Sequence, residues 1–346
     1  MNRILFAAGG TAGHIEPAWA VSLKWMEKYP GDELAFLGTK HGLEVTLIPE
    51  RGGRLFLIPK VTFPRKLSFN LLLTPLKTIF MLVKSVQIVK KFDVVVGFGG
   101  YVAGSAYLAA RICGKPIVIH EQNAKAGIAN RLGSMFTNYI GVAYSNTEIA
   151  GAKVIGNPLR DEVVKSAVQT NWPSARSEAK SRLNVNGKLL LILGGSQGAQ
   201  AINQVITNNL ELFQDFQVIH SLGNQNELPN ATNHYHPVHY IKDVATHLLA
   251  ADLIISRSGA LATSEIAALG KYTVFIPLPV GNGEQSLNCM DLVKTGKAEM
   301  VLQKEFTGEW LEKNWERISH VISDEPAGGI LDAAESLVAL IESALK

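Results

Sequence analysis

Two glycine-rich segments stand where a backbone could hold a phosphate. Gly9-Gly10-Thr11-Ala12-Gly13-His14 follows an apolar run and opens a helical pattern, and Gly194-Gly195-Ser196-Gln197-Gly198 repeats this arrangement. Glycine lets main-chain N–H groups approach an anion, and a helix start adds partial positive charge. Ser196 either donates to a phosphate or caps its own helix. The sequence therefore predicts an anion site at the first of these segments.

Two side chains in the first half are candidates for a general base. His14 lies at the predicted helix start, and an imidazole can accept a proton near neutral pH. The alternative for His14 is a polar cap. His120-Glu121-Gln122-Asn123 directly follows the buried run PIVI, and polar groups at the carboxyl end of a strand favour a site over a core. Glu121 is therefore the rival candidate base.

A second anion site is predicted at the helix start 258–265, where small residues leave N–H donors open to a diphosphate. Glu265 would then accept hydrogen bonds from two ribose hydroxyls, or would stabilise its own helix. Arg160 follows the segment GNPL and is either a phosphate ligand or a solvated surface residue. Gln285, in GNGEQ, carries an amide that could read sugar hydroxyls.

Neither a redox cofactor nor a metal is predicted. The pattern GxGxxG is incomplete in both halves, and the run ELAFLGT ends in Gly38 and Thr39 instead of the acidic residue that binds an adenosine ribose. The chain has no DxD triplet, and no carboxylate or cysteine near His234, His236 and His239 completes a ligand set. Helix starts and Arg160 must then neutralise a bound diphosphate.

Composition narrows the class of partner. The chain has 346 residues, with 33 basic and 30 acidic side chains and a net charge of +3, which is too balanced for a nucleic-acid-binding protein. Cys113 and Cys289 lie far apart, as expected for free thiols in a reducing compartment. No signal peptide or membrane-spanning run is visible, which favours a soluble chain that touches a membrane at most.

The elements that position these groups occur twice. Three segments of the first half recur in the same order in the second half: 3–14 as 189–200, 93–110 as 252–269, and 115–123 as 271–279. In the first two pairs, a continuous apolar run leads through glycine or small residues into a helical pattern, which is typical of parallel strands buried on both faces. We therefore expect an α/β protein with two Rossmann-like doubly wound domains facing a cleft.

Two further segments bear on the organisation of the domains. The domain boundary is expected near GNPLR at 156–160, and 331–346 has the apolar spacing of an amphipathic helix. The segment 70–91 is apolar around most of its circumference, with Lys77 and Lys84 on a narrow stripe. It is either a buried helix or a surface that dips into lipid.

The long motifs resemble those of the MurG family in content and order. They are GGTAGHIEPAWA, GFGGYVAGSAYLAA, IHEQNAKAG, GNPLR, GGSQGAQAIN, SRSGALATSEIAALG and EQSLNC. The resemblance implies the glycosyltransferase B fold and transfer of GlcNAc from UDP-GlcNAc to lipid I, giving lipid II for peptidoglycan synthesis. It implies an acceptor and membrane-side domain at 1–156, a UDP-GlcNAc-binding domain at 157–325, and a helix at 326–346 that returns to the first domain.

The resemblance also assigns residues. His14 matches the family's proposed base, and the substrate contacts fall on Thr11, Ala12, Gly13, Asn123, Arg160, Ser196, Ile241, Ala260, Leu261, Ala262, Thr263, Ser264, Glu265 and Gln285. Four positions depart from the family pattern: Ala12 replaces a glycine, Ala262 a threonine, Glu284 a Gln or His, and Glu16 an aromatic residue. Thr263 could supply the hydroxyl that Ala262 lacks.

The resemblance implies the setting as well. The enzyme would act without metal or cofactor at the cytoplasmic face of the plasma membrane, on an anionic lipid surface, with other cell-wall synthesis proteins as further partners. The rival enzyme is a UDP-GlcNAc 2-epimerase of the same fold. An oxidoreductase and a non-catalytic sugar-nucleotide scaffold are the alternatives from other classes.

Overall fold

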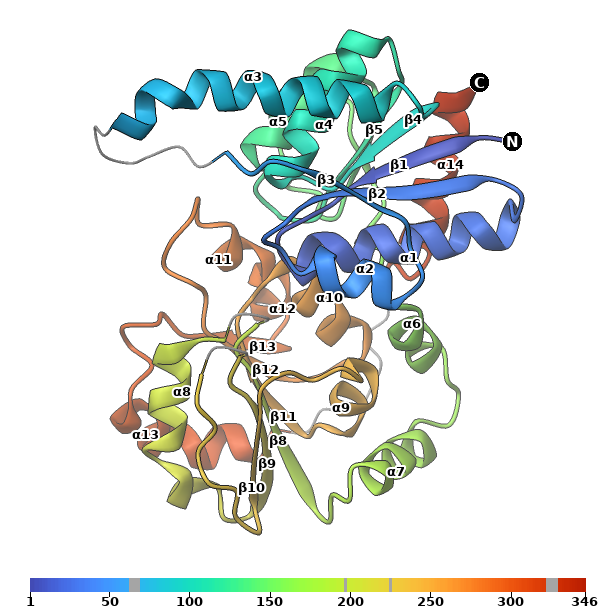
Figure 1. Ribbon diagram of the computed structural model, residues 1–346. Coiled ribbons are helices and arrows are strands. Elements are labelled where there is room, and N and C mark those ends of the chain that lie inside the picture. Colours follow the sequence, from blue (N-terminus) through green and yellow to red (C-terminus); the bar gives the residue numbers. More distant parts are fainter. Residues whose placement is uncertain (62–68, 196–197, 224–225, 322–328) are drawn as a thin grey trace. The chain divides into compact units, whose positions relative to one another are not determined.

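The computed structural model describes residues 1–61, 69–195, 198–223, 226–321 and 329–346, except for the side chains of 69–74. The chain divides into two compact units: unit 1 is Met1–Pro158 with Asp332–Lys346, and unit 2 is Leu159–Leu331. Each unit is a parallel sheet with helices on both faces (Figure 1). The predicted α/β class with two Rossmann-like doubly wound layers is confirmed.

Unit 1 contains a parallel sheet in the order β3-β2-β1-β4-β5-β6-β7. Its strands are β1 (Arg3–Ala7), β2 (Glu33–Thr39), β3 (Leu55–Ile58), β4 (Val94–Gly97), β5 (Ile117–Glu121), β6 (Tyr139–Val142) and β7 (Lys153–Val154). Its helices are α1 (Ala12–Lys28), α2 (Glu44–Glu50), α3 (Phe69–Val89), α4 (Gly100–Cys113), α5 (Ile128–Gly133) and α14 (Ala333–Leu345).

The apolar runs of unit 1 form strands because both faces of the sheet are covered. In β1, Ile4 and Phe6 pack into the core with α1 and α14, whereas Leu5 and Ala7 pack into the core with α3 and α4. Side chains that alternate between two buried faces require a continuous apolar run, as the sequence has. The C-terminal helix α14 is tied to α1 by the hydrogen bond from Tyr29 Oη to Glu342 Oε1, 2.9 Å.

Unit 2 contains a parallel sheet in the order β10-β9-β8-β11-β12-β13. Its strands are β8 (Lys188–Leu193), β9 (Phe216–Ser221), β10 (Tyr235–Val238), β11 (Leu253–Ser256), β12 (Thr273–Phe275) and β13 (Ala298–Met300). Its helices are α6 (Asp161–Ala167), α7 (Trp172–Arg182), α8 (Gln200–Thr207), α9 (Val244–Ala250), α10 (Ala260–Ala268), α11 (Glu284–Asn288), α12 (Met290–Lys294) and α13 (Gly308–Ser319).

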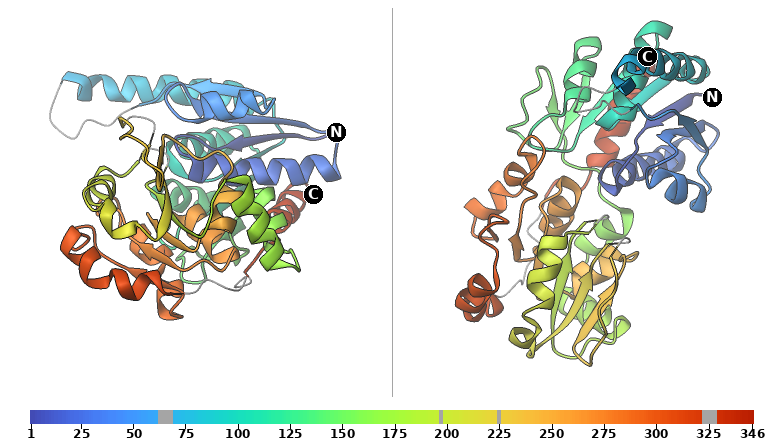
Figure 2. Two further views of the ribbon diagram at one scale, coloured as in Figure 1. Left: turned by 90° about the horizontal axis from the view of Figure 1, so that it is seen from below. Right: turned by 60° about the vertical axis from the view of Figure 1, so that its left-hand side comes forward.

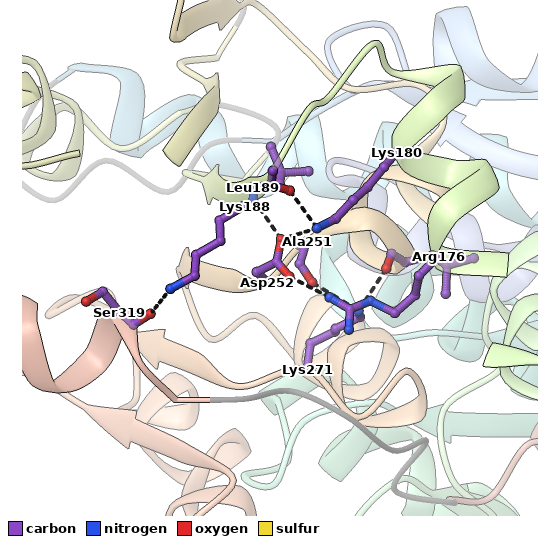
Figure 3. A network of polar contacts seen from close by, with 10 residues as sticks. Arg176, Lys180, Lys188, Leu189, Ala251, Asp252, Lys271 and Ser319 are labelled. Carbon is purple, nitrogen blue, oxygen red and sulfur yellow. Dashed lines mark hydrogen bonds and ion pairs between the residues drawn. The ribbon is translucent and has the colours of Figure 1, made fainter. Parts of the chain in front are cut away.

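A carboxylate anchors the amino-terminal end of this second sheet (Figure 3). Asp252, just before β11, accepts 2.7 Å hydrogen bonds from Arg176 Nη2 of α7 and from the main-chain N–H of Leu189 in β8. Lys180 Nζ lies 2.7 Å from the same carboxylate. One side chain therefore holds α7, β8 and β11 together, at the sheet edge opposite to the carboxyl ends where sites form.

Replacing Asp252 by alanine is expected to lower the free energy of unfolding by about 1–3 kcal/mol, because a main-chain N–H and two cations lose their acceptor. The measurement is urea unfolding of the full chain. Alanine at the exposed Asp215 is the control and should leave the midpoint within error. Equal midpoints for both variants would contradict the anchoring role.

Candidate active site

Each sheet has a point where its strand order reverses, and the glycine segments lie there. In unit 1 the chain runs outward from β1 to β3 and then returns to the other side of β1 as β4. In unit 2 the same reversal falls between β8 and β11. Loops diverge at such a switch point and leave room for a ligand beyond the carboxyl ends of the strands. The strand order of each sheet is therefore enough to predict where a ligand would bind.

The first glycine segment presents main-chain donors at the start of α1. Gly10 has φ +93°, and Thr11 is extended before the helix begins at Ala12. Among the described residues, no acceptor binds the N–H groups of Thr11, Ala12 and Gly13. Ala12 is helical and not among the residues with positive φ, so the backbone here does not require the family's glycine.

His14 is half-buried beside this turn. Its Nδ1 lies 3.1 Å from Thr11 Oγ1, and a Cβ atom placed on Gly100 would lie 3.6 Å from its Nε2. Burial lowers the pKa of His14 to about 4, opposed by the charge of Glu44. The imidazole is therefore neutral near pH 7 and able to accept a proton. The switch point between β1 and β4 positions it.

Glu121, the rival candidate base, is saturated with hydrogen bonds. Its Oε1 accepts from the N–H of Asn123 (2.9 Å) and from Asn123 Nδ2 (3.2 Å). Its Oε2 accepts from the N–H of Gly127 (2.9 Å) and from Asn130 Nδ2 (2.9 Å). A carboxylate offers about four acceptor positions, and all four here shape the loop after β5. This geometry favours His14 as the base.

The polar residues around Glu121 have structural partners of their own. His120 is buried and its Nε2 donates to the carbonyl of Gly156, 2.9 Å. Burial lowers the pKa of His120 to about 4. Asn157 Nδ2 donates to the carbonyl of Gln122, 3.3 Å. The residues at the end of β5 therefore hold residues 156–157 in place, just before the chain leaves unit 1.

The second glycine segment is closely packed in unit 2. A Cβ atom on Gly194 would lie 2.7 Å from the main-chain nitrogen of Ala199, and one on Gly198 would overlap the carbonyl oxygen of Leu222. These approaches explain the glycines without any ligand. Ser196, predicted to bind a phosphate or to cap α8, lies outside the described residues.

The segment 258–265 forms the start of α10, as predicted. Gly259 precedes the helix, and among the described residues nothing accepts from the N–H groups of Leu261 and Ala262. Ala262 is partly exposed, whereas Thr263 is buried and its hydroxyl has no partner within the described chain. The two main-chain donors are thus open to an anion at a helix start.

Arg160 and Glu265, both predicted to contact the donor, contact each other. Arg160 Nη1 donates to Glu265 Oε1 at 2.7 Å and to Oε2 at 2.6 Å. The Glu265 side chain is 2% exposed and the Arg160 side chain 14% exposed. The helix α10 supplies the carboxylate, and the turn before α6 supplies the guanidinium. The residue predicted to bind a phosphate and the residue predicted to bind a ribose are therefore paired with each other in the ligand-free chain.

Two further residues predicted to contact the substrate, Ile241 and Gln285, lie in the same unit, whereas Asn123 lies in unit 1. Ile241 is buried in the core cluster that also contains Leu261. Gln285 Oε1 accepts from the N–H of Leu278, 3.0 Å, and Asn288 Nδ2 donates to the carbonyl of Ser258, 3.1 Å. The helix α11, which carries Gln285, is thereby tied to the loop that begins α10.

Arg257 is a residue that the sequence analysis missed. It is 8% exposed, and its guanidinium donates to the carbonyls of Ile276 and Pro277 and to Gln303 Oε1. Among the described residues it forms no ion pair, and burial lowers its pKa. Neutral oxygen atoms, and no carboxylate of the described residues, therefore bind this guanidinium just before the start of α10. The only sequence signal was an arginine directly after an apolar strand.

The histidines 234, 236 and 239 lie in or next to the strand β10. His234 Nδ1 lies 3.3 Å from Thr232 Oγ1. Within the described ranges, no group of three or more His, Cys, Asp and Glu side chains is placed to hold an ion. His236 lies within β10, so the prediction of solvated loop residues is wrong for His236, whereas His239 follows the strand and is exposed.

Two protein-family models match this chain, one in each unit. Residues 4–142 match the glycosyltransferase family 28 N-terminal domain, and residues 189–327 match the glycosyltransferase family 28 C-terminal domain. The two sheets and their order are those of a glycosyltransferase of the B fold.

Full-length relatives narrow the class to one family. Two curated proteins named UDP-N-acetylglucosamine--N-acetylmuramyl-(pentapeptide) pyrophosphoryl-undecaprenol N-acetylglucosamine transferase are similar to this chain. The one from Corynebacterium diphtheriae is 38% identical, covering 99% of this chain and 97% of the relative. The one from Streptomyces coelicolor is 40% identical, covering 90% and 88%. The chain belongs to the MurG family of glycosyltransferases.

Solved structures agree with this assignment. Acinetobacter baumannii MurG is 28% identical with a TM-score of 0.76, and the match covers 99% of this chain and 100% of that chain. The UDP-GlcNAc 2-epimerase from Neisseria meningitidis is 14% identical with a TM-score of 0.60, covering 99% and 100%. The second likeness shows a shared fold alone.

Proposed function

We propose that the chain transfers GlcNAc from UDP-GlcNAc to the muramyl 4-hydroxyl of lipid I, giving lipid II with inversion at the anomeric carbon. The observation that carries the proposal is the identity to transferases of this name along nearly the whole chain. The geometry adds support, because the acidic, basic and main-chain groups needed for a sugar nucleotide lie together in unit 2.

Unit 2 is proposed to bind the donor. The open N–H groups at the start of α10 would hold the diphosphate, and Arg160 would add its charge. Glu265 would accept hydrogen bonds from the two ribose hydroxyls. The positive charge of Arg257, which its hydrogen bonds hold in place, would stabilise the negative charge that develops on UDP as it leaves. These cationic groups support departure of UDP without a metal ion.

Unit 1 is proposed to bind the acceptor and to move the proton. The N–H groups of Thr11, Ala12 and Gly13 would hold the lipid diphosphate. The neutral imidazole of His14 would take the proton from the 4-hydroxyl as its oxygen bonds to the anomeric carbon and the bond from that carbon to UDP breaks. UDP leaves with the electron pair of that bond.

Product analysis separates this function from that of the epimerase. The chain is incubated with UDP-GlcNAc, with and without a soluble lipid I analogue. We expect a disaccharide product and free UDP only when the acceptor is present. Conversion of UDP-GlcNAc to UDP-ManNAc without acceptor would refute the proposal and establish the epimerase. Tight binding of UDP-GlcNAc with neither product would instead favour a scaffold.

We also propose that α3 contacts an anionic membrane surface, as a lipid-linked acceptor requires. Figure 2 shows α3 along the outside of unit 1, where it packs beside α4. Met81 and Val89 are buried, so one side of the helix belongs to the core of unit 1.

The exposed side of α3 is apolar with basic residues beside it. Its exposed apolar side chains among the described residues are Leu76, Ile79, Phe80 and Val83. Lys77 and Lys84 lie next to them in the sequence, and Arg65 and Lys66 lie outside the described residues. Among the described residues, no helix is long and apolar enough to cross a bilayer.

Changing Ile79 and Phe80 together to serine is expected to reduce binding to phosphatidylglycerol vesicles at least ~10-fold, because two large apolar side chains no longer enter the lipid. Vesicle flotation measures the bound fraction. Val168→Ser is the control, since Val168 is a 61% exposed apolar residue of unit 2. Unchanged flotation of the double variant would remove α3 from the membrane contact.

A further inference from the structure

A fully buried carboxylate lies beneath the first glycine segment. Glu44, the first residue of α2, is 0% exposed. Three glycines surround its side chain: a Cβ atom on Gly9 would lie 2.8 Å from Glu44 Oε1, and Cβ atoms on Gly38 and Gly42 would overlap the Glu44 side chain. Such a carboxylate is held only where the surrounding chain supplies hydrogen-bond donors.

The donors come from the first glycine segment and from the end of β2. Gly10 N–H donates to Glu44 Oε2 at 2.8 Å, and Thr39 donates to Oε1 through its N–H at 2.7 Å and its hydroxyl at 3.2 Å. Glu44 therefore fixes the turn that leads into α1. It also occupies the N–H of Gly10, so the anion donors of this segment begin at Thr11.

The sugar transfer described above gives Glu44 no role. Its position excludes two roles: a base for the acceptor hydroxyl, and a group that helps to bind the diphosphate. The carboxylate is enclosed, so it cannot take a proton from a bound acceptor hydroxyl. It is also a negative charge beneath a segment proposed to bind a diphosphate, where it disfavours the anion. A buried charge retained at this place needs another use.

We propose that Glu44 is the positioning residue of His14: it fixes the turn that orients the imidazole and supplies the negative charge that stabilises the imidazolium when His14 accepts the proton. The connection is short, because Glu44 binds Gly10, and the next residue, Thr11, meets His14 Nδ1 at 3.1 Å. This proposal rests on the proposed function only in naming His14 as the base.

The other residues of unit 1 considered near His14 are paired, uncharged or exposed, so none of them takes the place of Glu44 in stabilising the imidazolium. On α1 itself, Glu16 is paired with Arg51 through two 2.9 Å hydrogen bonds. At the start of α4, the neighbouring residue is the uncharged Gly100. The loop before α2 carries His41, which is exposed. Desolvation lowers the pKa of His14, and the charge of Glu44 raises it. A base of very low pKa is a weak one, so Glu44 makes His14 a stronger base.

The proton balance is simple. His14 Nε2 gains the proton that the acceptor hydroxyl loses, and the charge on the imidazole changes from 0 to +1. The positive charge that forms on the imidazole is the charge form that Glu44 favours, since Glu44 raises the pKa of His14. A low-dielectric interior makes this charge compensation stronger than it would be in water.

The test is an NMR titration of His14 in the full ligand-free chain, compared with Glu44→Gln. We expect the midpoint of the variant to fall by roughly 0.5–1 pH unit, because the charge is lost while the size is kept. Glu121→Gln is the matched control: it neutralises another buried carboxylate of unit 1 and should leave the His14 midpoint unchanged. A midpoint that stays at its wild-type value in Glu44→Gln would overturn the proposal.

Activity adds a second readout that a purely structural role would not produce. Glu44→Gln should lower kcat about 10-fold in the wild-type background and should have no further effect in a His14→Ala background. An equal loss in both backgrounds would overturn the proposal. If the chain transferred no sugar at all, the proposed function would fail, whereas the titration would still decide the link between Glu44 and His14.

A conservative variant covers the case in which Glu44→Gln does not fold. Glu44→Asp keeps the charge but withdraws it by one methylene from Gly10. We expect a smaller fall of the His14 midpoint and a kcat between those of the wild type and Glu44→Gln. A wild-type midpoint in Glu44→Asp, together with an altered amide resonance of Gly10, would contradict the electrostatic role.

Discussion

Replacing His14 by alanine is expected to lower kcat by ~10²–10⁴-fold while the KM for UDP-GlcNAc stays nearly unchanged. The reason is chemical: the 4-hydroxyl of the acceptor has lost the group that takes its proton, and the proposed donor contacts lie in unit 2. Steady-state kinetics with a lipid I analogue measures both constants.

The control for this prediction is Glu121→Gln. The carboxylate of Glu121 is occupied by Asn123, Gly127 and Asn130, so this change should act through the loop after β5 and not through proton transfer. It should therefore leave the pH dependence of kcat in place. Near-normal turnover of His14→Ala would transfer the role of base to Glu121 or to water.

Replacing Glu265 by alanine is expected to raise the KM for UDP-GlcNAc and the Kd for UDP by about 10²–10⁴-fold. The proposed ribose contacts consist of two hydrogen bonds to a charged acceptor, each contributing roughly 1.5–3 kcal/mol. The variant also leaves Arg160 without the carboxylate that it binds in the ligand-free chain. Calorimetry with UDP measures the affinity directly, without acceptor or turnover.

Glu265→Gln is the companion variant, because it keeps the shape and one acceptor while it removes the charge. It should fall between the wild type and Glu265→Ala in UDP affinity. The affinity of all three proteins for UDP would be equal if Glu265 served only to stabilise α10. That result would reject the contact between Glu265 and the ribose, and with it the proposed binding site of UDP-GlcNAc at the start of α10.

The fold class could be predicted because its signals are local and repeated. Apolar runs such as LLLIL and VVV, each followed by glycine, are sufficient to define buried parallel strands. The helix at 70–91 was harder, because its composition fits a buried helix and a lipid-facing one equally well. In the structure the helix has both kinds of side chain: Met81 and Val89 are buried, whereas Ile79 and Phe80 are exposed.

The candidate site was predictable only where it follows a glycine motif or the family resemblance. Glu44 was missed because its partners Gly9, Gly38 and Gly42 are scattered over three segments, which meet only when β1 and β2 pair. Arg257 was missed for the same reason, since its carbonyl partners lie beyond the next strand. The pairing of Arg160 with Glu265 joins residues far apart in the sequence, and no spacing rule anticipates it.

The most direct test of the whole account is the rate of transfer of labelled GlcNAc to a lipid I analogue by the full chain in excess EDTA. Helix starts, Arg160 and Arg257 are proposed to carry the charge of the departing UDP, so the rate should equal that without EDTA and the product should be the β-1,4-linked disaccharide. A rate that collapses in EDTA and returns with added Mg²⁺ or Mn²⁺ would contradict the account, as would a product of retained configuration.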